Sequence, residues 1–472
     1  MWHKQIVLFL TDLFNIMNQN IEKVHFIAIG GSVMSNLAIA LKKNGIAVSG
    51  SDDAIYDPTK SKLEAAGLLP STFGWDLSKV TESIDAVILG MHAKDDNPEL
   101  LKAKELGIKI YSYPDFIYEQ AKNKQRIVIC GSHGKTTITA MIVHVLNFHK
   151  RHFDFVIGAA INGVDEMIRL TDAPIIIIEG DEYLTSPLDL TPKFLKYKHH
   201  IALVSGIAWD HINVYPTLDS YVEQFETLAD TTPKAGTLVY NEEDDMTSVI
   251  CKKERAGVKT IPYNTLKYKV KNGQCVLIAE DEKINLKIFG KHNMQNLNGA
   301  KTLLNRIGIT DKQFYQAIGS FEGTKKRNNL IAQNGTVSVY EDFAHAPSKL
   351  KASVSALKEL NPERKLTACF ELHTFSSLNK DFLGHYNKTY NAADTAIVYL
   401  NRQNITKKNL PEISDEDLKN GFGRKDLIIV DDPKKLSELI TSKDWKEENL
   451  IFMSSGNFDG LDVNQLAKNI TC

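Results

Sequence analysis

Short apolar runs alternate along the chain with amphipathic stretches of helical period. The first runs cover residues 24–29, 47–51 and 86–89, and helical patterns cover 36–43 and begin again after 97–98. Strands that alternate with helices are typical of βαβ units and a parallel sheet. The pattern therefore predicts a first α/β unit that ends near residue 124.

A second unit opens with a continuous apolar strand at 127–130, followed by a glycine-rich loop and a helical pattern at 137–148. Further apolar strands lie at 175–179 and 201–205. Strands that are apolar throughout are buried on both faces, as in a doubly wound sheet. We expect this unit to extend to residue 323.

The last third of the chain repeats the alternation. A strand at 337–340 and a helix at 350–360 come first, and further strands are expected at 366–370, 395–399, 427–430 and 450–453. The whole pattern predicts an α/β protein of three domains: a Rossmann-like domain, a central domain with a parallel sheet, and a C-terminal Rossmann-like domain. Their expected bounds are 23–124, 125–323 and 324–472, after an N-terminal extension of residues 1–22.

Composition narrows the class of protein. The 472 residues are 43% hydrophobic and 24% charged with a net charge of −2, which excludes a disordered chain and offers no basic excess for nucleic acid. No apolar run reaches the roughly 20 residues of a membrane helix. The five cysteines form no CxxC pair, and few, scattered cysteines are typical of a reducing compartment. We expect a cytoplasmic protein without a nucleic-acid or membrane partner.

The glycine-rich loop has the features of a phosphate site. It lies between a buried strand and a helix, where backbone N–H groups and the helix dipole can hold phosphates. Lys135 would reach the terminal phosphates and Thr136 would offer its hydroxyl to Mg²⁺. Ile129 replaces the first glycine of the common GxxxxGK[ST] pattern, so the loop is a shorter variant. A plain turn with a surface lysine is the alternative. The loop consists of Gly131, Ser132, His133, Gly134, Lys135, Thr136 and Thr137.

A second glycine turn follows the first strand. Gly30 and Gly31 form it, and Asp52 ends the next strand, which is similar to a dinucleotide fingerprint with an acidic ribose contact. Ala28 and Val33 stand at its first and third glycine positions. A nucleotide is expected here, but NAD is not supported, and a purely structural turn is the alternative.

Two polar clusters follow buried strands of the second unit. Glu179-Gly180-Asp181-Glu182 ends one strand and Asp210-His211 follows another. Carboxylates at the carboxyl end of a parallel strand suit Mg²⁺, and a neighbouring histidine could complete a two-metal phosphate site. Each cluster alone could be a solvated loop charge. Their joint placement beside the phosphate loop favours the metal site.

Taken together, these motifs resemble the Mur ligase family, the ATP-dependent amide-forming enzymes of peptidoglycan assembly. Residues 131–137 are similar to its short phosphate loop, 179–182 to its magnesium-binding acidic motif and 209–211 to its second metal motif. Residues 290–296, 321–327 and 342–347 resemble its adenine motif, its phosphate-contacting arginine stretch and its third-domain motif. The resemblance covers nearly the whole chain from residue 23 onward.

The resemblance implies two cofactors, ATP and Mg²⁺, and a role for each motif. ATP would be held by residues 131–137 with His292, Asn293, Asn296 and Arg327, and Mg²⁺ by Thr136, Glu179 and His211. The implied catalytic residues are Lys135, His211, Arg327, Asp342 and His345. The implied substrate-binding residues are Gly30, Gly31, Ser32, Asp52, His92 and His373.

Within the family, the branches that use UDP-N-acetylmuramate are the most similar. Their glycine turn and Gly-Ser-Asp motif resemble residues 29–31 and 50–52, so the first domain is expected to bind UDP rather than NAD. The lysine that other branches carry after the second metal motif is absent from 221–226. Two acceptor amines remain possible: the recycled tripeptide L-Ala-γ-D-Glu-meso-diaminopimelate and free L-alanine.

Local features favour the tripeptide. They lie at 51–58, 192–197, 342–347 and 454–458. Gly206, Ala346 and His373 depart from the family pattern, and the departure at His373 falls at the expected acceptor site.

The implied reaction needs activation, because a carboxylate oxygen is a poor leaving group. ATP would phosphorylate the lactyl carboxylate of UDP-N-acetylmuramate, and the amine would attack the acyl phosphate while the protein positions the groups and neutralises charge. Two other classes fit parts of the pattern: a P-loop sensor that binds UDP-sugar and ATP without ligation, and a nicotinamide dehydrogenase. Asp342 and His345 with the full metal set argue against the first, and the imperfect glycine pattern argues against the second.

Overall fold

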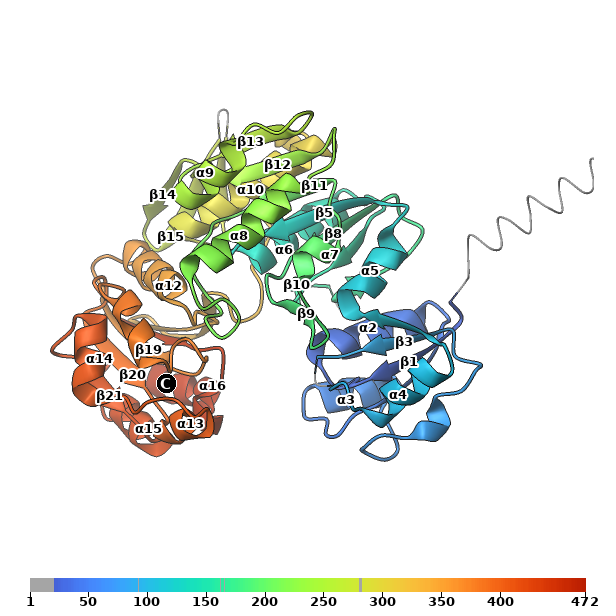
Figure 1. Ribbon diagram of the computed structural model, residues 1–472. Coiled ribbons are helices and arrows are strands. Elements are labelled where there is room, and N and C mark those ends of the chain that lie inside the picture. The colour runs from blue at the N-terminus through green and yellow to red at the C-terminus, as the bar shows by residue number, and fades with distance from the viewer. Residues whose placement is uncertain (1–20, 92, 162, 165, 280–281) are drawn as a thin grey trace, which may run out of the picture. The chain divides into compact units, whose positions relative to one another are not determined.

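The computed structural model describes residues 21–91, 93–161, 163–164, 166–279 and 282–472 (Figure 1). His92 and residues 1–20 of the expected N-terminal extension lie outside the described residues. The chain divides into two compact units. The first comprises the described residues up to Asn123 with Ile168–Ala173 and Leu184–Tyr197, and the second comprises Lys124–Met167, Pro174–Tyr183 and Lys198–Cys472.

The first unit is built on a parallel sheet with the strand order β2-β1-β3-β4. Strand β3 is buried over its whole length, and helix α5 packs on β3 and β4. Two segments that the sequence analysis assigned to the central domain, Ile168–Ala173 and Leu184–Tyr197, group with this unit. Its strands are β1 (Lys23–Ile27), β2 (Ala47–Ser51), β3 (Ala86–Leu89), β4 (Lys109–Ser112), β7 (Ile168–Arg169), β9 (Leu184–Ser186) and β10 (Asp189–Pro192). Its helices are α2 (Ser32–Lys43), α3 (Thr59–Ala65), α4 (Pro98–Glu105), α5 (Tyr113–Ala121) and α7 (Lys193–Lys196).

The second unit contains the parallel sheet of the central region, with the strand order β13-β12-β11-β5-β8-β6. The apolar strands are buried as expected, because helices cover both faces of such a sheet. The strands are β5 (Gln125–Cys130), β6 (Asp154–Val156), β8 (Ile175–Glu179), β11 (Ile201–Val204), β12 (Thr237–Asn241) and β13 (Lys259–Tyr263). An antiparallel sheet adds β14 (Tyr268–Lys271), β15 (Gln274–Ile278) and β16 (Lys283–Leu286). The helices are α6 (Lys135–Phe148), α8 (Leu218–Asp230), α9 (Asp245–Lys252), α10 (Lys291–Arg306) and α11 (Asp311–Ile318).

A six-stranded sheet occupies the C-terminal part of the second unit. Its order is β17-β18-β22-β19-β20-β21, and only the edge strand β17 is antiparallel to its neighbour among the described pairs. The strands are β17 (Asn329–Gln333), β18 (Val337–Asp342), β19 (Lys365–Glu371), β20 (Thr395–Tyr399), β21 (Ile428–Val430) and β22 (Glu448–Met453). The helices are α12 (Pro347–Leu360), α13 (Arg402–Lys407), α14 (Asp415–Phe422), α15 (Pro433–Thr441) and α16 (Val463–Thr471).

The central and C-terminal sheets of the second unit share one hydrophobic core. Buried side chains from both regions form a single cluster, and the rings of Phe289 and Tyr340 meet edge to face with centroids 6.0 Å apart. Helix α12 packs against α10 and β14. This packing places the start of α12 at the carboxyl edge of the central sheet.

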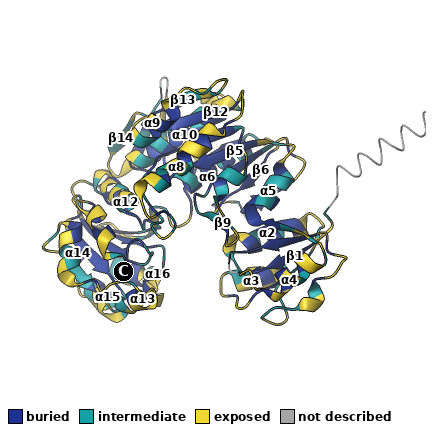
Figure 2. Cartoon of the chain, in the orientation of Figure 1, coloured by how far each residue is buried: buried dark blue, intermediate teal, exposed yellow. Residues whose placement is uncertain are grey.

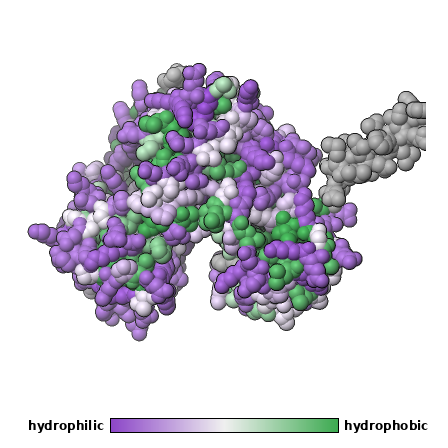
Figure 3. All heavy atoms as spheres, in the orientation of Figure 1, coloured by the Kyte–Doolittle hydropathy of each residue, from purple (hydrophilic) through white to green (hydrophobic). Residues whose placement is uncertain are grey.

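Burial follows the elements as the sequence pattern predicts. The strands are mostly dark blue in Figure 2, whereas helices such as α14 and α15 show exposed faces. The surface visible in Figure 3 is mostly hydrophilic, with small apolar areas scattered over it. Within the described residues, no helix is both long and apolar enough to cross a bilayer.

The buried histidine His199 should make the folded protein less stable in acid. The His199 side chain lies 2.8 Å from the Thr232 hydroxyl and is 2% exposed. Burial lowers the pKa of His199 to about 4, below the value of about 6.5 expected in the unfolded chain. Its contribution to stability is therefore complete above pH 6.5 and is lost as the pH falls toward 4.

We expect the free energy of unfolding of His199→Gln to fall less steeply with decreasing pH than that of the wild type. The difference in unfolding free energy between the two proteins should change by about 1.4 kcal/mol per pH unit between pH 6 and 4.5. Urea unfolding at several pH values measures it. Parallel stability–pH curves for the two proteins would contradict a buried, neutral His199.

Candidate active site

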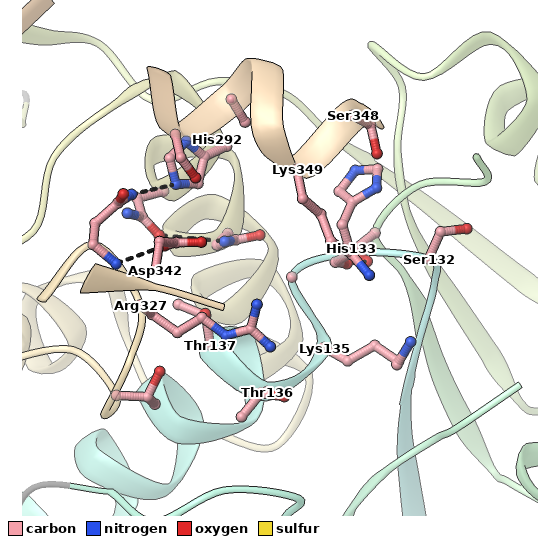
Figure 4. A pocket seen from close by; sticks show the side chains of 18 of the residues that line it. Ser132, His133, Lys135, Thr136, Thr137, His292, Arg327, Asp342, Ser348 and Lys349 are labelled. Carbon is pink, nitrogen blue, oxygen red and sulfur yellow. Dashed lines mark hydrogen bonds between the residues drawn. The ribbon is translucent and has the colours of Figure 1, made fainter. Parts of the chain in front are cut away.

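A cavity of about 360 Å³ lies at the carboxyl edge of the central sheet (Figure 4). The ends of β5 and β8, the segment after β11, and helix α10 form one side. The end of β18 and the first turns of α12 form the other. Residues far apart in the sequence therefore meet here because parallel strands end at a common edge.

The phosphate loop has the strand–loop–helix conformation that its sequence predicts. Gly131 has φ +127°, and a Cβ atom there would lie 2.3 Å from the Ser205 hydroxyl, so only glycine fits. Ser132 accepts a hydrogen bond from the Ala208 backbone and contacts the Tyr221 hydroxyl at 2.7 Å. The loop is thereby held against the segment after β11, and its last residues open helix α6.

Gly206, which departs from the family pattern, is explained by a close approach. A Cβ atom at this position would lie 2.4 Å from Cε1 of His133. The missing side chain therefore makes room for the imidazole of the phosphate loop. Burial lowers the pKa of His133 to about 4, so this ring is neutral at pH 7.

Lys135 is held by a carboxylate in this structure. Its Nζ atom lies 2.5 Å from Oε2 of Glu182 and 2.6 Å from the carbonyl oxygen of Gly131. Burial opposes the ionisation of Glu182, but Lys135 and His211 outweigh it and lower the pKa of Glu182 far below its usual range. Burial likewise opposes the charge on Lys135, and the surrounding carboxylates raise the pKa of Lys135 above its ordinary value. Both groups are charged.

The expected metal ligands fall into two groups. Thr136 donates a hydrogen bond to Oε1 of Glu179 at 2.6 Å, and the Gly158 backbone donates to Oε2 at 2.7 Å. His211 contacts a different carboxylate: its Nε2 atom lies 3.3 Å from Oε1 of Glu182. The described residues hold no group of three or more His, Cys, Asp or Glu side chains arranged as a metal site. A hydroxyl beside one carboxylate nevertheless fits Mg²⁺, which takes its other oxygens from phosphates and water.

The residues expected to contact adenine lie together at the start of α10. His292, Asn293 and Asn296 all line the cavity. Asn293 donates to the Phe289 carbonyl at 2.8 Å, which orients its amide. Burial lowers the pKa of His292 to about 4, so its ring is neutral. Their contact with the base stays a prediction.

The third-domain motif faces the phosphate loop across the cavity. Arg327 stacks over the Phe343 ring, with 5.1 Å between the guanidinium carbon and the ring centroid. Asp342 accepts hydrogen bonds at 2.6 Å from the backbone of Asn328 and of Ala344, and burial raises the pKa of Asp342. Burial also lowers the pKa of His345 to about 3, so its imidazole is uncharged.

The glycine turn of the first unit has the conformation that its sequence suggests. The Gly30 backbone donates a 2.6 Å hydrogen bond to Asp52, which is buried, and Ser32 begins helix α2. Ala28 stands at the first glycine position of the fingerprint and has φ +66°, a conformation that favours glycine. UDP binding by Gly30, Gly31, Ser32 and Asp52 stays a prediction. The predicted substrate contact of His92 lies outside the described residues.

His373 is the residue expected to contact the acceptor. It follows β19, its side chain is 44% exposed, and Nδ1 lies 3.6 Å from Oε1 of Glu371. It is not among the described residues that line the cavity. Its proposed contact with an outer carboxylate therefore concerns a surface outside the cavity.

Several contacts of the site were not expected from the motifs. Glu182 holds both Lys135 and His211, Tyr221 contacts the loop, and Asp210 pairs with Lys349 at 3.3 Å. Glu182 belongs to a recognised acidic motif, so its sequence gave a usable signal. Lys349 lies four residues after His345, in the first turn of α12.

Comparison with known proteins identifies the relatives of this chain. The model of the Mur ligase middle domain matches residues 129–304, and that of the Mur ligase family, catalytic domain, matches 23–125. A UDP-N-acetylmuramate–L-alanine ligase from Caldicellulosiruptor bescii is 30% identical over 393 residues, which cover 80% of this chain and 83% of that protein.

Solved structures show the same fold. A UDP-N-acetylmuramate–alanine ligase from Thermotoga maritima has a TM-score of 0.70 at 21% identity, covering 95% of this chain and 98% of that one. A murein peptide ligase from Psychrobacter arcticus has a TM-score of 0.66 at 22% identity, covering 95% and 99%. The expected arrangement of N-terminal, middle and C-terminal α/β domains is confirmed.

Replacing Lys135 with Ala should nearly abolish ATP turnover. The substitution removes the loop cation, and losing one preorganised charge contact of this kind costs about 10²–10³ in rate. It also leaves Glu182 buried without its closest partner, so Lys135→Ala/Glu182→Gln is the matched control for folding. Steady-state kinetics and thermal unfolding measure both effects. A folded variant with wild-type turnover would refute the phosphate-loop assignment.

Glu179→Ala and His211→Ala should raise the Mg²⁺ concentration needed for half-maximal turnover, or abolish turnover. UDP-sugar binding should survive, because the turn that is expected to bind it belongs to the first unit. Magnesium titrations of activity, with UDP-sugar binding by calorimetry as the control, measure this. Normal magnesium dependence in both variants would make these side chains ordinary loop charges.

Proposed function

The chain belongs to the Mur ligase family and is an ATP-dependent ligase that forms an amide bond, and we propose that it joins UDP-N-acetylmuramate to an amine. The observation that carries the proposal is the shared cavity. It brings Lys135 and Thr136 of the phosphate loop opposite Asp342 and His345 of the third-domain motif. Activation of a carboxylate and attack by an amine can therefore occur in one cavity.

The proposed chemistry has two steps. A lactyl carboxylate oxygen attacks the γ-phosphorus of ATP, so that an acyl phosphate forms and ADP leaves. The amine, after losing its extra proton, attacks the acyl carbon; phosphate leaves, and the nitrogen loses a second proton to become the amide. The protein supplies mainly position and charge in both steps.

The resting contacts suggest how the site accepts ATP. Lys135 is paired with Glu182, so entering phosphates compete with that carboxylate for the ammonium. Thr136 and Glu179 would hold Mg²⁺, which would neutralise phosphate charge when bound. Arg327 would contact the transferred phosphoryl group, and His292, Asn293 and Asn296 would place the adenine.

The amine is the open part of the proposal. We propose the tripeptide L-Ala-γ-D-Glu-meso-diaminopimelate, because the segments at 51–58 and 454–458 favour that branch. His373 is half-exposed beyond the cavity, where an extended acceptor could reach it. L-Alanine is the second candidate, because the 30%-identical relative from Caldicellulosiruptor bescii is named an L-alanine ligase.

Phosphate release tests the proposed reaction. A ligase should release phosphate from ATP at a high rate only when UDP-N-acetylmuramate and an amine are both present. A protein that binds both nucleotides without releasing phosphate under any of these conditions would instead be a sensor.

We expect the tripeptide to have a higher kcat/KM than L-alanine. The two amines offer the same attacking nitrogen, so the difference measures binding of the remote groups in the transition state. One assay with both amines at matched concentrations decides this, and His373→Ala should reduce the preference. A higher kcat/KM for L-alanine would assign the protein to the alanine-adding branch.

A further inference from the structure

A cation outside the recognised motifs enters the cavity. Lys349 lies in the first turn of α12, its side chain is only 15% exposed, and it lines the same cavity as Lys135 and Arg327. Figure 4 shows it extending from the helix toward the phosphate loop, beside His133. An amphipathic helix usually keeps such a lysine in water, because burying an ammonium is costly without partners.

Two partners orient the Lys349 ammonium. Its Nζ atom lies 3.3 Å from Oδ2 of Asp210 and 3.1 Å from Nε2 of His345. Nδ1 of His345 lies 2.8 Å from the Phe343 carbonyl, which can only accept, so Nδ1 carries the hydrogen and Nε2 accepts. His345 therefore receives a hydrogen bond from Lys349 in this structure.

These contacts leave the ammonium a donor for a ligand. An ammonium has three N–H groups. Within the part of the chain that the structure describes, Asp210 and His345 are the hydrogen-bond partners of Lys349 and use two of them. The third can meet an anion in the cavity without either contact breaking.

The nearby charges indicate which anion. Lys349 lines the same cavity as two other cations, Lys135 and Arg327. Burial lowers the pKa of Lys349, Asp210 opposes this, and the charges of Lys135 and Arg327 act in the same direction as burial. Clustered cations repel one another until an anion binds between them. A multiply charged phosphoryl group satisfies that requirement better than the single carboxylate of an amino acid.

We propose that Lys349 is a third cationic contact to the transferred phosphoryl group, beside Lys135 and Arg327. The inference rests on the proposed ligase function and adds a catalytic residue to it. Asp210 and His345 act as positioning residues for the ammonium. Because Lys349 and His345 both follow β18, one short segment would bring this cation and the amine-facing histidine into the site together.

Nucleotide binding to the full chain tests the contact without an amine. Lys349→Gln should weaken binding of a non-hydrolysable ATP analogue with Mg²⁺ by about ten- to a hundredfold, the usual effect of losing a hydrogen bond between charged groups. Binding of MgADP, which lacks the γ-phosphate, should change less than about twofold. Lys349→Arg should restore part of the lost affinity, because arginine also contacts phosphate as a cation.

Lys351→Gln is the matched control, because Lys351 lies on the same helix and is exposed. It should leave both affinities unchanged. Equal effects of Lys349→Gln on ADP and on the ATP analogue, or no effect on either, would overturn the contact. A wild-type protein that binds neither nucleotide would overturn the proposed ligase function itself, and the contact with it.

Single-turnover kinetics separate the phosphoryl group from the acceptor as the ligand of Lys349. With UDP-N-acetylmuramate and ATP but no amine, Lys349→Gln should slow ADP formation about 10²–10³-fold. A normal rate of ADP formation combined with a raised KM for the amine would show that Lys349 binds the acceptor, and would overturn the proposal. Thermal unfolding and MgADP binding confirm that the variant is folded.

Discussion

The parallel alignment of the central strands is the constraint on which the site depends. Cys130 at the end of β5 is in register with Val204 at the end of β11, and Ile129 is in register with Glu179 at the end of β8. The loops that follow these strands must therefore leave the sheet at one edge. The phosphate loop, the acidic motif and the Asp–His motif are brought together by this register, although the sequence separates them widely.

Buried charge determines how these loops are arranged. An ammonium or carboxylate removed from water must be paired, and the cavity meets this condition twice, with Lys135 on Glu182 and Lys349 on Asp210. The first pair lies within the central region, whereas the second joins the central region to helix α12. In this structure each of the two ammonium groups therefore has a carboxylate partner.

The two sheets of the second unit share a hydrophobic core, and this core explains why the third-domain motif can line the same cavity as the phosphate loop. Helix α12 packs on α10 and β14, and Phe289 packs against Tyr340. These contacts hold His345 and Lys349 at the cavity. The first unit has its own sheet and its own glycine turn. Local contacts shape that turn: Ala28 has a positive φ, and the Gly30 backbone donates a hydrogen bond to Asp52.

The sequence by itself determined the α/β class and the strand–loop–helix conformation of residues 131–137, because each depends on local periodicity or on a motif at a strand end. It placed Glu179, Glu182 and His211 after buried strands, but the contact between His211 and Glu182 emerged only in the structure. Lys349 meets Asp210, 139 residues away, only through register and helix packing. Tertiary structure alone decides such contacts, because the burial that forces charges to pair exists only in the folded chain.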